Sequence, residues 1–144
     1  MALLLAVFIV VASGVTALYF FRGGTGQSTT TILPSGCVRP PGGFLIIASV
    51  TGYNGSIDHG VPANSWPIIQ VQRGTTVRVT VCNVDHQAHG FQITHYFDSS
   101  IEALSPGQVL NVSFVADKSG AFTIKCSIFC TVHGFMLSGS LVVT

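Results

Sequence analysis

The chain has 144 residues, of which 48% are hydrophobic and only 8% are charged, and its formal net charge is +1 at pH 7. Six basic residues are too few for the basic patch that neutralises phosphates, so a nucleic-acid partner is not expected. The scarcity of charge also argues against strong electrostatic docking and indicates that protein partners bind over an apolar or polar surface.

The first segment, residues 2–21, is uncharged and rich in Leu, Val, Ala and Phe. As a helix it would span roughly 30 Å, at about 1.5 Å per residue, which is the thickness of a bilayer's hydrocarbon core. Residues 1–22 are therefore predicted to form a single transmembrane anchor, with aromatic residues beside Arg22 at the interface. A cleaved signal peptide is the alternative, although the apolar run is long for one and no basic segment precedes it.

The segment after the anchor, residues 23–36, is rich in Gly, Ser and Thr, which is typical of a flexible linker. The folded domain is therefore predicted to cover residues 37–144. Within it, β-branched and aromatic runs alternate with turn-forming residues, and no run has a helical period. Short strands at such spacings are typical of an antiparallel sandwich or barrel, so an all-β fold is predicted. The runs are residues 44–50, 66–72, 75–84, 90–97, 108–116, 120–126 and 138–144.

Four cysteines are too few for a small disulfide-stapled protein, and their spacing is uneven. Cys37 and Cys82 could form a disulfide outside the cytoplasm, or could lie buried as small apolar residues. The second interpretation, two unpaired buried cysteines, is preferred.

The chemically richest segment is residues 126–136, CSIFCTVHGFM. Thiolate, imidazole and thioether groups together suit copper that cycles between Cu(I) and Cu(II), whereas Mg and Ca prefer oxygen ligands. Predicted strands precede and follow the segment, so the ligands would lie on a loop fixed at both ends. Such a loop can hold a metal in nearly constant geometry in both redox states, which favours electron transfer. The ligand candidates in the segment are Cys126, Cys130, His133 and Met136.

A second contribution is expected from the segment NVDHQAHGFQI, which follows the predicted strand at residues 75–84. His89 precedes an apolar Gly-Phe pair and is the candidate for the distant ligand, whereas His86 stays undecided. His59 and His95 are interpreted as structural, because lone histidines are usually surface or core residues.

From about residue 44 to residue 144, the paired-cysteine loop and the His-Gly-Phe sequence resemble the dinuclear CuA domain of cytochrome c oxidase subunit II and nitrous oxide reductase. That family belongs to the cupredoxins. The resemblance implies a Greek-key β-sandwich with two copper ions that share one transferable electron. It implies bridging thiolates from Cys126 and Cys130, terminal imidazoles from His133 and His89, a weak axial thioether from Met136 and a backbone carbonyl from Ile128.

Two departures from the family pattern are present. Only Thr131 and Val132 separate Cys130 from His133, one residue fewer than in the family, and this gives the spacing of the shortest mononuclear blue-copper loops, as in amicyanin. The segment from Asp85 to the distant histidine is one residue longer than in the family. If the alignment on His-Gly-Phe is wrong, His86 is the ligand instead of His89.

The strand that enters the loop distinguishes two copper sites from one. In cupredoxins the first ligand cysteine typically follows Gly-x-aromatic-x-apolar-x, and Gly120, Phe122 and Ile124 place Cys126 in that position. A site built on Cys130 alone would leave Cys126 unused, so two coppers in a CuA centre are favoured and one type 1 copper is the alternative. Structural zinc and a catalytic Cys-His pair fit less well, because methionine is a poor zinc ligand and no acidic partner or oxyanion donor is evident.

The function that the resemblance implies is that of a membrane-anchored subunit II of a haem-copper terminal oxidase in a respiratory chain. Whether the chain counts as an enzyme is open, because it would be at most the electron-receiving subunit of a cytochrome c oxidase-type complex. Its partners would be a soluble redox donor, either a small copper protein or a cytochrome, and the catalytic haem-copper subunit. The alternatives are a free-standing membrane-anchored mononuclear cupredoxin and a copper storage or delivery protein.

The expected location is the cell membrane, with a single crossing and the copper domain on the extracytoplasmic side. In the resembling family, copper loading and exchange with soluble donors occur there. An apolar docking surface is expected around His133, Gly134 and Phe135.

Overall fold

The structure is a computed structural model that describes residues 32–60, 65–98 and 102–144. The predicted anchor and most of the predicted linker fall on residues 1–31, outside the described residues. In the ranges that are described, no helix is long and apolar enough to cross a membrane. The regular elements of these ranges are strands, together with two short 3-10 helices, and the all-β prediction is confirmed.

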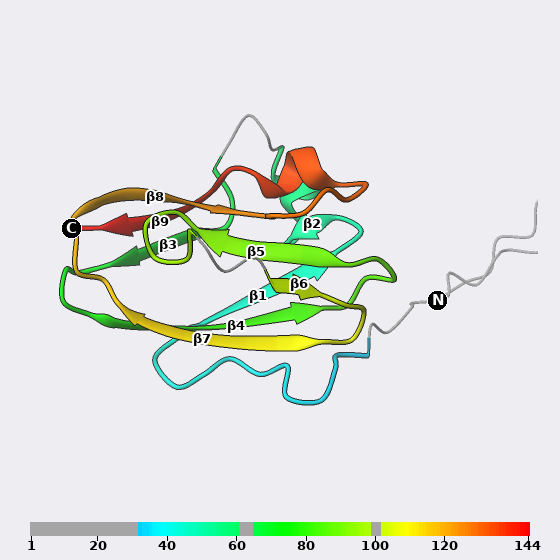
Figure 1. Ribbon diagram of the computed structural model, residues 1–144, viewed down its shortest axis with the longest axis horizontal. Helices are drawn as coiled ribbons and strands as arrows, with labels where there is room; N and C mark the ends of the chain where they lie inside the picture. The colour runs from blue at the N-terminus through cyan, green and yellow to red at the C-terminus, as the bar shows by residue number, and fades with distance from the viewer. Residues whose placement is uncertain (1–31, 61–64, 99–101) are drawn as a thin grey trace, which may run out of the picture. The chain divides into compact units, whose positions relative to one another are not determined.

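The first sheet has the strand order β2-β1-β4-β7 (Figure 1). β1 and β4 run parallel, whereas β4 pairs with β7 and β1 with β2 in antiparallel fashion. The strands are β1 (Phe44–Ser49), β2 (Gly52–Tyr53), β4 (Thr76–Asn83) and β7 (Val109–Val115).

The second sheet has the order β3-β9-β8-β5-β6. Here β3 and β9 are parallel and the other neighbours are antiparallel. The expectation of a purely antiparallel sandwich is therefore wrong for two strand pairs, β1–β4 and β3–β9, which join strands far apart in the sequence. The strands are β3 (Ile68–Val71), β5 (His89–Ile93), β6 (Glu102–Leu104), β8 (Gly120–Lys125) and β9 (Gly139–Val143).

The core consists of the inward-facing residues of both sheets. In β4, Val77, Val79 and Val81 are each 1% exposed, and they alternate along the strand because successive side chains point to opposite faces of a sheet. Ile93 and Ile124 of the second sheet belong to the same buried cluster. Each such side chain stabilises the fold by about 1.5–3 kcal/mol when fully buried.

Two 3-10 helices lie outside the sheets: η1 (Ser56–His59) follows β2, and η2 (His133–Met136) lies between β8 and β9. Figure 1 shows that the loop after β4, the loop after β8 and η2 gather at one end of the sandwich. The opposite end carries the C-terminus.

Cys37 and Cys82 form a disulfide, with their Cα atoms 5.7 Å apart. The preferred interpretation of two unpaired cysteines is therefore wrong. Cys82 is the penultimate residue of β4, so the disulfide ties the segment before β1 to the end of the strand that leads into the loop carrying His86 and His89. Both cysteines are buried, as expected, and the bond replaces two thiols in the interior.

Candidate metal centre

Two loops at one end of the sandwich carry the predicted ligands. The ligand loop, residues 126–136, follows β8 and leads through η2 to β9. The histidine loop, residues 84–89, follows β4 and ends with His89, the first residue of β5. Because β5 and β8 are antiparallel neighbours, with Gln92 opposite Lys125, the start of β5 lies beside the end of β8. Strand pairing therefore brings the two loops together.

Three buried sulfur atoms of the ligand loop lie close to one another. The Sγ atoms of Cys126 and Cys130 are 4.0 Å apart, and the Sγ atom of Cys130 is 3.8 Å from the Sδ atom of Met136. The backbone carbonyl oxygen of Ile128 is 3.0 Å from the Sγ atom of Cys126. Each thiol thus has a second, weaker metal-ligating atom beside it: the Ile128 carbonyl oxygen lies beside Cys126, and the Met136 thioether sulfur lies beside Cys130.

Two imidazole nitrogens complete this set of donors. His89 is fully buried, and one of its ring nitrogens lies within 4.8 Å of the Sγ atoms of Cys126 and Cys130. The Nδ1 atoms of both His89 and His133 are buried and make no hydrogen bond of ordinary length among the described residues, although both imidazoles lie close enough to the Cys126 thiol to lower its pKa. A buried polar atom without a partner costs about 1–3 kcal/mol, so such atoms are rare unless a ligand binds them. These two lone pairs fit a metal ion.

Asp85 fixes the orientation of the buried imidazole. Its Oδ2 atom lies 2.9 Å from the Nε2 atom of His89, so Nε2 is the nitrogen that carries the proton and Nδ1 is left as an acceptor. The carboxylate also accepts hydrogen bonds from the backbone N–H of His86 at 2.6 Å and from the side-chain amide of Gln87 at 2.9 Å. Burial raises the pKa of Asp85, but these hydrogen bonds outweigh it and the net pKa lies below its usual value.

Gly90 allows the two loops to approach each other closely. Its backbone N–H donates a hydrogen bond to the Sγ atom of Cys126 at 3.2 Å. A Cβ atom at this position would lie 2.7 Å from the backbone nitrogen of Ser127 and 2.9 Å from that of Ile128, so no larger residue fits without moving the backbone. The hydroxyl of the buried Tyr53 donates to the carbonyl oxygen of Gly90 and anchors the same residue from β2.

The two thiols have different acidities. Burial raises the pKa of Cys126. The imidazoles of His89 and His133 and the backbone amide of Gly90 have a larger effect in the opposite direction, and the net pKa is lowered to about 6. Burial and the neighbouring Cys126 thiolate raise the pKa of Cys130 to about 11. Without metal, the site therefore holds one thiolate near neutral pH. Because metal ligands must be deprotonated, metal uptake would release protons.

The structure brings together the six residues predicted as ligands and separates the other histidines from them. The side chain of His86 is 84% exposed, whereas that of His89 is 1% exposed and faces the thiols. The imidazole of His59 stacks on Trp66, with ring centroids 3.7 Å apart. His95 stacks on Phe122, at 5.3 Å between centroids, in the turn after β5.

Sequence reasoning missed three residues near the site. Tyr53 lies on β2, a strand too short to give a periodic pattern. Gln87 links the two loops through its side chain, and an inter-loop hydrogen bond leaves no local signal. Phe129 is 91% exposed on the ligand loop, with its ring centroid 5.6 Å from that of His133. Phe129 lies next to the residues around which a docking surface was expected, of which Phe135 is half-buried.

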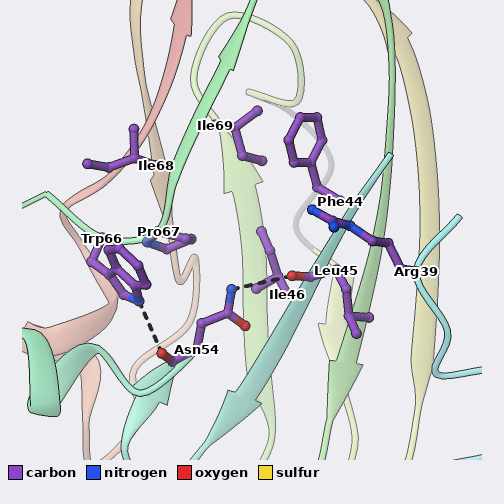
Figure 2. A pocket seen from close by; sticks show the side chains of 9 residues that line it. All are labelled: Arg39, Phe44, Leu45, Ile46, Asn54, Trp66, Pro67, Ile68 and Ile69. Atoms are coloured by element: carbon purple, nitrogen blue, oxygen red, sulfur yellow. Dashed lines mark hydrogen bonds between the residues drawn. The ribbon is translucent and has the colours of Figure 1, made fainter. Parts of the chain in front are cut away.

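A pocket of about 140 Å³ lies away from these donors, beside β1 and the start of β3 (Figure 2). The Trp66 indole donates to the Asn54 carbonyl oxygen at 3.1 Å, and the Asn54 side chain donates to the Leu45 carbonyl at 3.3 Å. The residues that line it include no cysteine, histidine or methionine. The sulfur and imidazole donors therefore do not line this pocket.

No protein-family model matches the chain. The chain is 34% identical over 85 residues to nitrous-oxide reductase of Pseudomonas fluorescens, an alignment that covers 57% of this chain and 13% of that protein. It is 36% identical over 76 residues to nitrous-oxide reductase of Stutzerimonas stutzeri, covering 51% of this chain and 12% of that protein. The matched part is thus a small portion of these much longer relatives.

Solved structures share the fold. Auracyanin of Roseiflexus castenholzii has a TM-score of 0.53 at 18% identity, with 71% of this chain and 96% of that chain covered. A multicopper oxidase gives 0.55 at 19% identity, with 74% and 45% covered. Copper nitrite reductase of Nitrosomonas europaea gives 0.53 at 19% identity, with 70% and 40% covered. The described domain therefore has the cupredoxin fold, and its likeness to nitrous-oxide reductases confirms the CuA-type resemblance that the sequence predicted.

Proposed function

We propose that the chain is a copper electron-transfer protein whose cupredoxin domain holds a dinuclear CuA centre. The observation that carries the proposal is the pair of buried thiols 4.0 Å apart, flanked by two buried imidazole nitrogens that make no hydrogen bond of ordinary length. Thiolate, imidazole and thioether groups form a donor set that suits both oxidation states of copper. Bound copper would supply the one-electron redox chemistry that the side chains lack.

Two ions account for the donors better than one. A mononuclear site would use one thiolate and leave the other as a buried bystander. The two weaker metal-ligating groups also lie beside different thiols: the Ile128 carbonyl is beside Cys126, and the Met136 thioether is beside Cys130. The ligands would be the predicted set: His89, Cys126, Ile128, Cys130, His133 and Met136.

The protein would contribute a fixed and water-poor environment. Cys126, Cys130, Met136 and His89 are at most 6% exposed, and they are attached to strands of the same sandwich. Pre-positioned ligands change little when the charge of the centre changes, which keeps the barrier to electron transfer low. Asp85 holds the His89 imidazole, and the Gly90 amide donates a hydrogen bond to one thiolate.

Electrons would enter over Phe129, the exposed apolar side chain of the ligand loop, which lies beside the half-buried His133. The proposed donor binds here without strong charge pairing, because only 8% of the chain is charged. Replacing Phe129 by serine should slow the reaction with the physiological donor severalfold and leave the copper spectrum unchanged. A rate that falls steeply as salt increases would contradict an apolar docking surface.

At the level of the whole protein, we propose a membrane-anchored subunit II of a haem-copper oxidase, on the extracytoplasmic side of the cell membrane. The apolar segment at residues 2–21 supports the anchor, and the Cys37–Cys82 disulfide agrees with an oxidising compartment. The partners would be a soluble copper protein or cytochrome and the catalytic haem-copper subunit. A free-standing cupredoxin carrier is the second candidate, supported by the likeness to auracyanin along nearly its full length.

The deciding experiment is to load the full chain with copper, measure the metal content and record the electron paramagnetic resonance spectrum. Two coppers per chain, with hyperfine structure from one electron shared by two nuclei, would support the CuA centre. One copper with single-nucleus hyperfine structure would replace it by a blue-copper site. Tight zinc binding that copper cannot displace would overturn both, because the two thiols and two imidazoles could also bind zinc.

A further inference from the structure

The two departures from the family pattern meet at one contact. The histidine loop has one residue more than the family pattern, and the ligand loop has one residue fewer between Cys130 and His133. In the structure, the side chain of Gln87 reaches from the longer loop to Thr131, the first residue of the shortened segment. Its Nε2 atom lies 2.6 Å from the Oγ1 atom of Thr131, and its Oε1 atom accepts a hydrogen bond from the Thr131 backbone N–H at 3.1 Å.

The same amide group also binds the partner of the buried histidine. Gln87 Nε2 donates to Asp85 Oδ2 at 2.9 Å, and that oxygen lies 2.9 Å from Nε2 of His89. A glutamine side chain has two N–H donors and one carbonyl acceptor. All of these functions are used here, on Asp85 and on Thr131.

We propose that Gln87 is a positioning residue that fixes the shortened ligand loop against the His89–Asp85 pair and so sets the distance between the donors of the two loops. This inference rests on the proposed copper function for its importance, but the contact itself can be tested without metal. Thr131 directly follows Cys130, and Asp85 holds His89, so the hydrogen bonds run from one proposed ligand to the other.

Two substitutions at this position separate the roles of the amide. Methionine has nearly the shape of glutamine but cannot form any of these hydrogen bonds. Glutamate keeps the acceptor for the Thr131 N–H but has no donor for Asp85, and its charge repels that carboxylate. Gln70, exposed on β3 and away from both loops, offers a matched control.

The first test uses the metal-free full chain and amide hydrogen exchange by NMR. The Thr131 amide should exchange about fivefold faster in Gln87→Met, as expected for the loss of one hydrogen bond of about 1 kcal/mol. It should remain protected in Gln87→Glu and in the control Gln70→Met. Equal protection of Thr131 in Gln87→Met and in the unaltered chain would overturn the inference, whether or not copper binds.

The second test asks whether the contact positions the donors. In copper-loaded protein, Gln87→Met and Gln87→Glu should both change the copper hyperfine splitting and the reduction potential, whereas Gln70→Met should change neither. Faster Thr131 exchange with an unchanged spectrum and potential would reduce Gln87 to a loop contact and overturn the positioning role. If the unaltered chain binds no copper, the proposed function fails, while the exchange result still decides whether the contact exists.

Discussion

The chain has two pairs of buried cysteines with different fates. Cys37 and Cys82 are 5% and 0% exposed and are joined in a disulfide, whereas Cys126 and Cys130 are 2% and 6% exposed and remain free thiols 4.0 Å apart. Burial is therefore the same for both pairs. The difference lies in the neighbours, because only the second pair is surrounded by imidazole, thioether and carbonyl donors. Burial alone does not distinguish a metal-binding pair of cysteines from a disulfide. The distinguishing feature is a set of imidazole nitrogens that face the thiols and make no ordinary hydrogen bond.

The largest expected effect comes from the free pair. Replacing Cys126 by serine should abolish the dinuclear copper spectrum, because serine is a poor ligand for Cu(I) and the site would keep only one of its two thiolates. Metal analysis and electron paramagnetic resonance measure the result. The control is the double variant Cys37→Ser, Cys82→Ser, which should keep its copper. Retention of the full two-copper spectrum without Cys126 would remove the distinction between the two pairs.

The second effect concerns the nitrogen donors that distinguish the free pair. His89→Ala should lower copper affinity strongly, since it removes a buried donor and leaves Asp85 with one partner fewer. His86→Ala should lower affinity far less, because the His86 side chain is 84% exposed and touches the site only through Asp85, whose Oδ1 atom lies 2.7 Å from its Nδ1 atom. Competition with a copper chelator measures both affinities. The opposite order would mean that His86 is the distant ligand and that the histidine loop rearranges on binding.

The third effect concerns the bonded pair. Removing the Cys37–Cys82 disulfide should lower the free energy of unfolding by about 4 kcal/mol, as loop-closure entropy predicts for a sequence separation of 45 residues. Denaturant unfolding of the metal-free protein measures the change. The copper spectrum of folded protein should stay the same. A spectral change would show that the disulfide also shapes the histidine loop.

The smallest effect is the pH dependence of the metal-free protein. The pKa of Cys126 is lowered to about 6, so its thiolate stabilises the folded state above the unfolded pKa of about 8.5, and this contribution is lost as pH falls through about 6. The pKa of Cys130 is raised to about 11, so its contribution is lost as pH rises toward that value. Stability should therefore rise from about pH 6 to about pH 8.5 and fall above it. In Cys126→Ser, the rise should disappear.

Much of the fold could be predicted because inward and outward residues alternate along the strands. The seven predicted runs match the long strands, but β5 begins one residue before its predicted run, at His89, and ends at Ile93, where a turn with His95 at a positive φ of 73° begins. β2 and β6 have too few residues for a period. The parallel pairs β1–β4 and β3–β9 depend on contacts between distant segments, which local patterns do not encode.

The parts of the candidate site that depend on residue type and on spacing along the chain could be predicted from the sequence. The sulfur and imidazole side chains of one loop predicted four of the proposed ligands, and the His-Gly-Phe sequence predicted His89 as the fifth side chain. The disulfide was only the less preferred interpretation, because pairing depends on the distance between Cys37 and Cys82 in space, which their separation in sequence does not reveal. Gln87 and Phe129 were missed for a related reason, since a contact between loops and the exposure of one aromatic ring are properties of the folded chain.

The Cys37–Cys82 disulfide also determines how the domain would carry a mechanical load. A pull on the chain before Cys37 passes through the covalent bond into β4, a strand flanked by β1 and β7 in the middle of its sheet. Residues 38–81 form a closed loop and are bypassed, so β1 and β2 bear none of this tension. A tethered domain built in this way resists being unravelled from its N-terminal side, because tension shears a central strand instead of peeling an edge.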